Sequence, residues 1–465
     1  MAGFGRMNTS TTHPAMTDRN VCPTKFRQSR LQGHAPSTRQ FLSQRLKTAR
    51  ASDTVRDGTQ LESLMIPLAE RMQLISDSIT LAVSAKANAL KKAGVDVVGF
   101  GAGEPDFDTP EFIKDAAKTA LDLGQTKYTP TPCFPELRQA IADKFNRENN
   151  LPYKPEQVTT GAGGKHCLYM AFMAVLNPGD EVVIPSPYWV SYPEQVKLAG
   201  GVPKILRGEE SNGFKITPQQ LKGAITSKTR VLLINSPSNP SGIAYTPEEL
   251  QALANVAACH DDLIVFSDEI YEKLIYDGIT FVSFAALNQK LLERTLTFNC
   301  HSKSFAMTGW RIGYIGGPKY IIDAINKLQS QMTSHITSFT QMPAVAALTD
   351  PRRHESLANM HAQFEKRGRH MWQRLSELPK IHCVKPQGAF YCFPNVSAYF
   401  GRKAGGAIIT DAVSFSAALL EQNHVAVVPG NDSGFDTHVR LSFATSMEQI
   451  DKGIDWIGEF LKKLA

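Results

Sequence analysis

Three short strand-like runs, each followed by polar residues, constrain the fold of this chain more than any other feature. They occupy residues 231–234, 263–266 and 295–299. Continuous apolar runs bounded by turn residues are typical of buried parallel strands. The chain has 465 residues, 42% of them hydrophobic, which is enough for two domains and a large core. We therefore expect parallel strands within an α/β fold.

Residues able to bind a ligand follow each run. Asn239 follows the first run, Asp268 and Tyr271 the second, and Lys303 and Arg311 the third. Ligands of α/β proteins bind outside the carboxyl ends of the strands. A buried carboxylate needs a partner, a desolvated lysine can form a Schiff base, and an arginine fork suits a phosphate. Taken alone, the lysine and arginine would more often be a surface lysine and a salt-bridged arginine.

Two further segments have the chemistry of a binding site. Residues 158–166 lead from a short strand through a glycine-rich turn, with Gly163 and Gly164, into an apolar helix. Backbone N–H groups at a helix N-terminus attract anions, so Lys165 in the first turn is unfavourable unless an anion lies nearby. Trp189, in a loop after a strand, suits stacking on a flat ring. An exposed lysine and a core tryptophan are the alternatives.

The sequence SKSFAMTGWRIGY at residues 302–314 favours a binding site over these alternatives. It closely resembles the Schiff-base signature of class I pyridoxal-phosphate aminotransferases, in the bacterial-type aspartate aminotransferase branch. The likeness covers nearly everything from residue 66 onward. It implies an α/β fold of type I, with a large domain built on a mostly parallel doubly wound sheet and a smaller α+β domain from both chain ends. The expected limits are 1–64 for an extension, 65–110 for an N-terminal arm and part of the small domain, 111–345 for the large domain, and 346–465 for the C-terminal small domain.

The resemblance also implies a role for each candidate cofactor residue. Lys303 forms the Schiff base with pyridoxal phosphate, and Asp268 keeps the pyridine nitrogen protonated. Asn239 and Tyr271 hold the phenolate oxygen, which makes Lys303, Asp268 and Tyr271 the catalytic residues. The other cofactor contacts are Gly163, Gly164, Lys165, Trp189, Ser302, Arg311 and Tyr128. Tyr128 comes from the neighbouring subunit, so a homodimer is implied, and no metal is expected.

The substrate residues implied by the resemblance suit an acidic amino acid. Arg440 binds the α-carboxylate with its planar fork, assisted by the backbone of Gly103. Lys165 meets the distal carboxylate, with Thr80 and Ser78 assisting, while Trp189 and Asn239 complete the contacts. The expected reaction is ping-pong transamination between aspartate or glutamate and a 2-oxo acid.

Three other activities are weighed against this one. Prephenate, with a distal carboxylate on its ring, is a possible second substrate. A pyridoxal-phosphate lyase of the same fold is less favoured because of Lys165. A transcription regulator of this fold would carry a DNA-binding domain, and the first 64 residues show no helix-turn-helix pattern.

The chain departs from the family pattern at four positions. Cys133 stands where a glycine is usual, so a backbone that needs positive φ is expected to be strained there. His301 and His335 replace small residues, and Cys300 stands at a position that often carries a small or hydroxyl residue. These three are expected to narrow the pocket or to change substrate choice.

Charge and cysteine usage set the remaining expectations. The first fifty residues hold nine Lys and Arg and one Asp, a net charge of about +8. Because the whole chain has a net charge of +6, the remaining residues carry about −2. This balance argues against nucleic-acid binding by the folded body. Seven scattered cysteines indicate a reducing compartment without a zinc site, and no apolar run reaches a membrane span.

Residues 1–64 show no sustained apolar periodicity, and we expect them to be disordered. They resemble an organellar transit peptide in composition, being rich in arginine and poor in acidic residues. Alternatively, Met65 starts a bacterial cytoplasmic protein. We expect a cytoplasmic location, with plastid stroma or mitochondrial matrix as the alternative.

Overall fold

The computed structural model describes residues 66–76 and 79–464. The chain divides into two units, Met1–Leu68 and Ala69–Ala465, and every helix and strand described lies in the second. The expectations for residues 1–64, for Met65 and for Ser78 fall outside the described residues.

A seven-stranded sheet forms the centre of the second unit. Its strand order is β2-β8-β7-β6-β5-β3-β4, and all neighbours are parallel except β8, which is antiparallel to β2 and β7. The strands are β2 (Val158–Ala162), β3 (Glu181–Ser186), β4 (Val202–Arg207), β5 (Thr229–Asn235), β6 (Ile264–Asp268), β7 (Thr295–Cys300) and β8 (Ile312–Gly316). The three predicted runs are β5, β6 and β7, which confirms the mostly parallel sheet.

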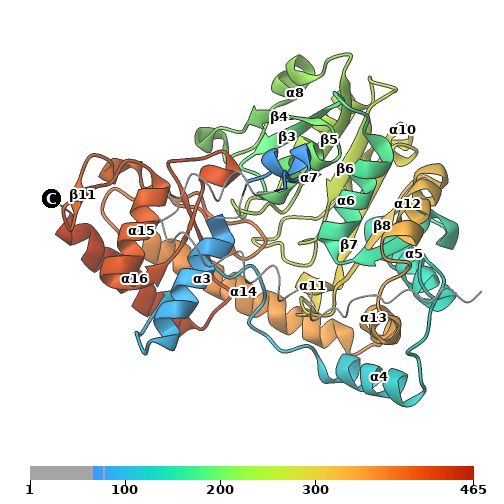
Figure 1. Cartoon of the computed structure of the whole chain (residues 1–465), viewed down its shortest axis with the longest axis horizontal. Coiled ribbons are helices and arrows are strands. Elements are labelled where there is room, and N and C mark those ends of the chain that lie inside the picture. The colour runs from blue at the N-terminus through green and yellow to red at the C-terminus, as the bar shows by residue number, and fades with distance from the viewer. Residues whose placement is uncertain (1–65, 77–78, 465) are drawn as a thin grey trace, which may run out of the picture. The chain divides into compact units, whose positions relative to one another are not determined.

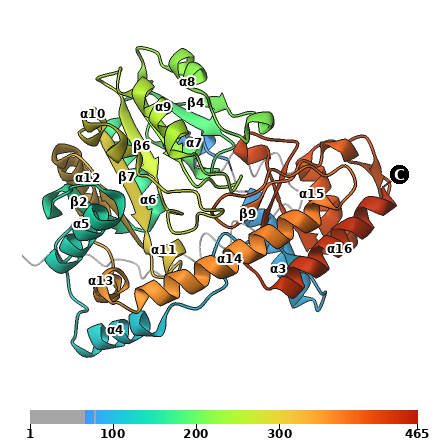
Figure 2. The same cartoon turned by 180° about the vertical axis from the view of Figure 1, so that it is seen from behind.

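Helices cover both faces of this sheet, because alternate residues of its buried strands point to opposite sides. Val231 and Leu233 of β5 pack with α6 and α12, on the face seen in Figure 1. Leu232 and Ile234 pack with α8 and α9, on the face seen in Figure 2. The helices on the sheet are α6 (Gly164–Val175), α7 (Ser191–Leu198), α8 (Pro218–Ala224), α9 (Pro247–Ala257), α10 (Gln289–Leu292), α11 (His301–Ser304) and α12 (Lys319–Met332).

A third helical group packs beside the β2 and β8 edge. It shares one apolar cluster with these two strands and consists of α4 (Glu111–Asp122), α5 (Pro135–Asn149) and α13 (Gln341–Thr349). Pro135 begins α5, where its missing N–H costs nothing because the first helical N–H groups have no partner within the helix. The short 3-10 helices are η1 (Glu70–Gln73), η2 (Pro155–Gln157), η3 (Glu210–Asn212), η4 (Phe284–Leu287), η5 (Ser338–Thr340), η6 (Ser397–Tyr399) and η7 (Asn431–Ser433).

A smaller α+β part joins residues from both ends of the chain. Strand β1 (Val98–Gly99) pairs in parallel with β12 (Val425–Ala426), and helix α3 (Ile79–Lys92) packs against the same region through Ala87. Helix α14 (Arg353–Ser376) runs from beside α13 to α16 (Figure 2). The other elements are β9 (Tyr391–Cys392), β10 (Lys403–Ala404), β11 (Ala407–Ile408), α15 (Ala412–Asn423), β13 (Val428–Pro429), β14 (Val439–Ser442) and α16 (Met447–Lys463).

This arrangement confirms the predicted fold class, while the residue limits of the two domains stay a prediction. No helix in the described part of the chain has both the length and the apolar character of a membrane span. Among the same residues, no group of His, Cys, Asp and Glu side chains is arranged to hold a metal ion.

Candidate active site

A cavity of about 1040 Å³ opens at the carboxyl ends of the parallel strands. It is lined by residues from segments far apart in the sequence, including both ends of the second unit. Ten of the residues predicted from the sequence line it: Gly103, Gly164, Lys165, Trp189, Asn239, Asp268, Tyr271, Lys303, Arg311 and Arg440. The cavity is therefore the candidate site.

Lys303 enters the cavity from the short helix α11, directly after β7. Its Nζ donates a hydrogen bond to the carbonyl oxygen of Gly103 at 2.5 Å and lies 5.7 Å from the centre of the Phe390 ring. The side chain is half-buried, so its amine is held in place yet remains open to a ligand. The neighbouring Ser302 is buried and does not line the cavity.

Asp268 ends β6 and is almost fully buried. Its Oδ2 accepts a hydrogen bond from the Tyr192 hydroxyl at 2.6 Å, and its Oδ1 accepts one from the backbone N–H of Ile270 at 3.3 Å. Burial raises the pKa of Asp268 to about 6, and the Tyr192 hydrogen bond opposes that rise. A cationic ligand group in the cavity would therefore be stabilised by this carboxylate.

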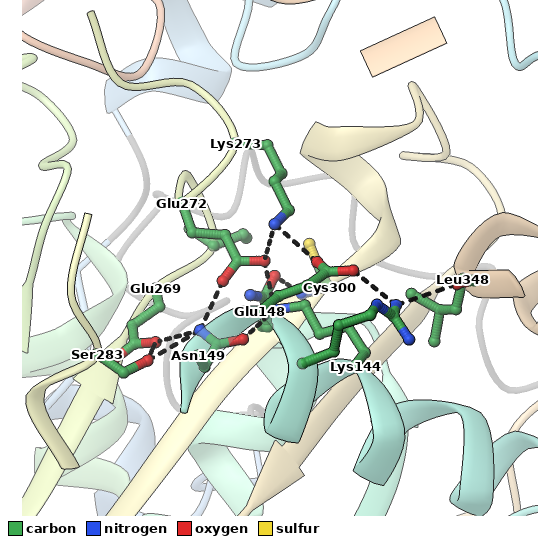
Figure 3. A network of polar contacts seen from close by, with 12 residues as sticks. Lys144, Glu148, Asn149, Glu269, Glu272, Lys273, Ser283, Cys300 and Leu348 are labelled. Atoms are coloured by element: carbon green, nitrogen blue, oxygen red, sulfur yellow. Dashed lines mark hydrogen bonds and ion pairs between the residues drawn. The ribbon is translucent and has the colours of Figure 1, made fainter. Parts of the chain in front are cut away.

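A buried polar network holds the turn that follows Asp268 (Figure 3). The amide of Asn149 donates to Glu272 at 2.8 Å and to Ser283 at 2.8 Å, and Ser283 in turn donates to Glu269 at 2.5 Å. Lys144 forms an ion pair with Glu272 and donates to Asn149 at 2.7 Å. Because Glu269 and Glu272 flank Tyr271 in the sequence, the network anchors the Tyr271 segment to helix α5.

Arg440 reaches the cavity from β14 in the smaller part. Its Nη1 donates to the side-chain oxygen of Asn239 at 3.1 Å, and its Nη2 donates to the carbonyl oxygen of Gly101 at 2.9 Å. Its Nε is buried without a hydrogen-bond partner among the described residues. An arginine with an unused buried donor is suited to bind a carboxylate.

The glycine-rich turn packs directly against Arg311. Gly163 has φ of 82°, and a Cβ at this position would collide with the Arg311 guanidinium. Arg311 donates to the carbonyl oxygens of Ala162 at 3.3 Å and Thr308 at 2.8 Å. Helix α6 begins at the next residue, Gly164, so its free N–H groups lie beside the arginine. This pairing of a helix N-terminus with a guanidinium is suited to a phosphate.

Lys165 lies in the first turn of α6, as predicted, with its Nζ 5.0 Å from the centre of the Trp189 ring. Burial, together with the nearby charge of Arg311, lowers the pKa of Lys165. Both side chains line the cavity. A ligand carboxylate beside Lys165 would stabilise its charged form.

Four predicted residues do not line the cavity of this chain. Gly163 lies behind Arg311, and Ser302 is buried behind Lys303. Tyr128 is 90% exposed, and its ring contacts His335 edge-on at 5.6 Å. Thr80 lies in α3, but its side chain is outside what the structure describes. The assignment of Tyr128 to a neighbouring subunit therefore stays a prediction.

The departures from the family pattern have different outcomes. Cys133 is buried with φ of 138°, which confirms the expected positive φ. His301 lies in the core, where its Nε2 faces the Ala344 carbonyl at 3.2 Å and burial lowers its pKa to about 4. His301, His335 and Cys300 are absent from the lining of the cavity in this chain, and their effect on pocket width or substrate choice stays a prediction.

Sequence reasoning missed two phenols of the cavity. Tyr192 supports Asp268, and Tyr391 lies with its hydroxyl 3.0 Å from that of Tyr271. Asn299 and His166 also line the cavity. Nδ2 of Asn299 and Nε2 of His166 are buried without a hydrogen-bond partner among the described residues. Tyr192 lies three residues after Trp189, but no local pattern points to its contact with Asp268.

Known proteins resemble this chain over most of its length. The family model "Aminotransferase class I and II" matches residues 95–457. An aspartate aminotransferase of Bacillus subtilis is 50% identical over 396 residues, which cover 85% of this chain and 99% of the relative. An aspartate/prephenate aminotransferase of Cereibacter sphaeroides is 47% identical over 399 residues, or 86% and 99% of the two chains.

A solved structure agrees with these sequence relatives. The aspartate aminotransferase of Thermus thermophilus with maleate matches with a TM-score of 0.80 at 42% identity, over 85% of this chain and 100% of its own. The family match spans well over half of the chain and includes the cavity residues from Gly103 to Arg440. The chain therefore belongs to the class I and II aminotransferases, which are pyridoxal-phosphate enzymes.

Proposed function

We propose that this enzyme moves an amino group between aspartate or glutamate and a 2-oxo acid by a ping-pong route. One observation carries the proposal: an amine, Lys303, and two cations, Arg440 and Lys165, converge on a single cavity. An acidic amino acid has one amino group and two carboxylates, which these three side chains match. The names of the Bacillus relative and of the Thermus structure support the same substrate class.

The cavity residues fit pyridoxal phosphate. The buried carboxylate of Asp268 would pair with the pyridine nitrogen and keep it protonated. The glycine-rich turn at Gly163 and the Arg311 guanidinium would hold the phosphate, because the free N–H groups at the start of α6 lie beside that guanidinium. Trp189 would stack on the ring. When bound, the cofactor supplies an electron sink for the substrate's α-carbon.

Three side chains would complete the cofactor contacts and the proton transfer. Asn239 and Tyr271 line the cavity, and their polar groups would hold the phenolate oxygen. Lys303 would bind the cofactor covalently through Nζ and, once displaced by the substrate amine, act as the base. Its amine would take the proton from the substrate's α-carbon and deliver it to the adjoining cofactor carbon as an acid.

Two cations would select the substrate. Arg440 would bind the α-carboxylate, with its buried Nε available as an additional donor and the Gly103 backbone nearby. Lys165 would meet the distal carboxylate, with Thr80 assisting. Burial makes an unpaired charge on Lys165 unfavourable, so a substrate with a carboxylate beside Lys165 would bind more tightly than one without it. Maleate in the Thermus structure is likewise a dicarboxylate.

Prephenate transamination is the second candidate. The aspartate/prephenate aminotransferase of Cereibacter sphaeroides covers the same length of this chain at 47% identity. A cavity of about 1040 Å³ also leaves space for a ring between the distal carboxylate and the α-carbon.

We further propose that the enzyme is a cytoplasmic homodimer with Tyr128 reaching the partner's phosphate. The phenol is 90% exposed although large and partly apolar, which is consistent with burial by a second copy. Light scattering would give the oligomeric state. Mixing Tyr128→Phe with Lys303→Ala subunits would restore one intact site per mixed dimer only if Tyr128 acts in the partner's cavity, because the subunit that keeps Lys303 then receives an intact Tyr128 from the other.

The absorption spectrum of the holoenzyme tests the reaction class. Aspartate and glutamate should convert the cofactor to its amine form much faster than alanine does, and an arogenate trace reports on prephenate chemistry. Lys165→Met should remove the preference for acidic donors. Lys197→Met is the matched control, because Lys197 lines the same cavity but pairs with Glu194 at 2.9 Å. If no amino acid converts the cofactor, transamination is the wrong reaction.

A further inference from the structure

The phenol of Tyr391 lies between two groups of the proposed active site. Its hydroxyl is 3.0 Å from the hydroxyl of Tyr271, which comes from the turn after β6. Its ring lies 4.6 Å from the guanidinium carbon of Arg440. Tyr391 lines the cavity and is almost fully buried. It therefore contacts a cofactor-side residue and a substrate-side residue at once.

The strand register explains this position. Tyr391 of β9 is directly opposite Ser442 of β14, so Arg440 is its diagonal neighbour on the same face of the antiparallel pair. Diagonal neighbours are within reach of aromatic and long side chains. The hydroxyl of Tyr391 also contacts that of Tyr271, which is 120 residues away in the sequence and follows a strand of the central sheet. The phenol thus links the smaller part of the fold to the cofactor side of the cavity.

We propose that Tyr391 is a positioning residue that fixes the direction of the Tyr271 hydroxyl and the place of the Arg440 guanidinium. The Tyr391 hydroxyl donates to the oxygen of Tyr271, which leaves the Tyr271 proton free to donate to the phenolate oxygen of the cofactor. The Tyr391 ring meanwhile supports the guanidinium from one face. This proposal rests on the proposed function, since it assigns Tyr271 to the cofactor and Arg440 to the substrate.

The proton count of the two phenols supports this direction. Each phenol has a single proton to donate, but its oxygen can accept as well. If Tyr271 donated to Tyr391, it would have no proton left for a phenolate. Donation by Tyr391 instead polarises Tyr271 and strengthens its outgoing hydrogen bond.

Two substitutions separate the hydroxyl from the ring. In Tyr391→Phe holoenzyme, Tyr271 donates a weaker hydrogen bond, which stabilises the phenolate of the cofactor less. The pKa of the nitrogen that joins Lys303 to the cofactor should therefore rise. The pH midpoint of the visible absorption band should rise by about 0.5 unit, while the KM for aspartate stays within about twofold. Tyr391→Leu should raise the same midpoint and also raise the KM for aspartate about fivefold, because Arg440 loses the ring.

Tyr153→Phe is the matched control. Tyr153 is a buried phenol that faces the Thr297 hydroxyl at 3.4 Å and is absent from the cavity lining. Its loss should leave both the midpoint and the KM unchanged. The inference is overturned if Tyr391→Phe leaves the midpoint at the wild-type value, or if Tyr391→Leu leaves the KM unchanged.

The wild-type spectrum keeps the two proposals distinguishable. Failure of wild-type enzyme to convert its cofactor with aspartate would contradict the proposed function. Conversion by wild type together with unchanged variants would contradict only the role of Tyr391.

Discussion

The hydroxyl of Tyr192 donates to Oδ2 of Asp268 at 2.6 Å, and both side chains are buried. The two residues are 76 positions apart, in α7 and at the end of β6. Burial raises the pKa of Asp268 to about 6, and this hydrogen bond stabilises its ionised form. A neutral phenol thus helps to keep a buried carboxylate charged.

Removing that hydroxyl should move the acid side of the activity profile. Activity that needs the ionised carboxylate is lost as pH falls through the pKa of Asp268, which the proposed pairing with the pyridine nitrogen lowers below its value in the cofactor-free protein. Tyr192→Phe raises this pKa, and the loss should begin about one pH unit higher, with kcat near neutral pH lowered about tenfold. A pH–rate profile of wild type, Tyr192→Phe and Tyr153→Phe measures this; coincident profiles for all three would contradict the role of Tyr192.

A methyl group at Gly163 should weaken cofactor binding. Gly163→Ala places a Cβ against the Arg311 guanidinium, which must then leave the proposed phosphate position. We expect the Kd for pyridoxal phosphate to rise more than tenfold, which corresponds to about 1.4 kcal/mol or more. Gly179→Ala is the control, because Gly179 also has positive φ, 90°, but has no atom within 4 Å of an added Cβ. Equal Kd values for the two variants would show that the contact between the added methyl group and Arg311 does not weaken cofactor binding.

The buried carboxyl of Glu269 should make stability fall as pH rises. Burial raises its pKa from 4.5 to about 7, so between these values the folded state binds more protons than the unfolded state. The resulting stability is complete below pH 4.5 and is lost as pH rises through 7. Glu269→Gln should remove this slope and gain about 3 kcal/mol on wild type between pH 4.5 and 8.

Urea unfolding at pH 5 and pH 8 measures the Glu269 effect. The exposed Glu156 provides a control for the change in net charge, since Glu156→Gln should follow the wild-type pH dependence. A parallel pH dependence for Glu269→Gln and wild type would mean that this carboxyl does not titrate in the folded protein.

Backbone strain at Cys133 should make this position intolerant of branching. Its φ of 138° is one that β-branched residues adopt at high cost. Cys133→Val should lower the free energy of unfolding by about 2 kcal/mol more than Cys392→Val, which adds the same atoms to a buried strand residue. Thermal unfolding of the two variants measures this difference. Equal losses of stability would indicate that steric crowding by the larger side chain, and not backbone strain, destabilises both variants.

Local patterns were sufficient to predict the strand ends and the residues that follow them. The runs at 231–234, 263–266 and 295–299 became β5, β6 and β7, and Lys165 lies in the first turn of its helix. These features depend on periodicity and on turn residues that are close together in the sequence, so they can be predicted without the tertiary structure. The Schiff-base signature added the family, because its residues are contiguous.

Contacts between distant segments had no such local signal. Tyr192 bonds to Asp268 across 76 residues of sequence, and Tyr271 contacts Tyr391 across 120 residues. His301 likewise lies in the core, where its ring packs against Tyr314 of strand β8. The sequence by itself determined which residues stand at the strand ends and which family they belong to. Only the tertiary structure decided which phenol supports which carboxylate or arginine, because those partners meet through sheet order and strand register rather than through neighbouring positions in the chain.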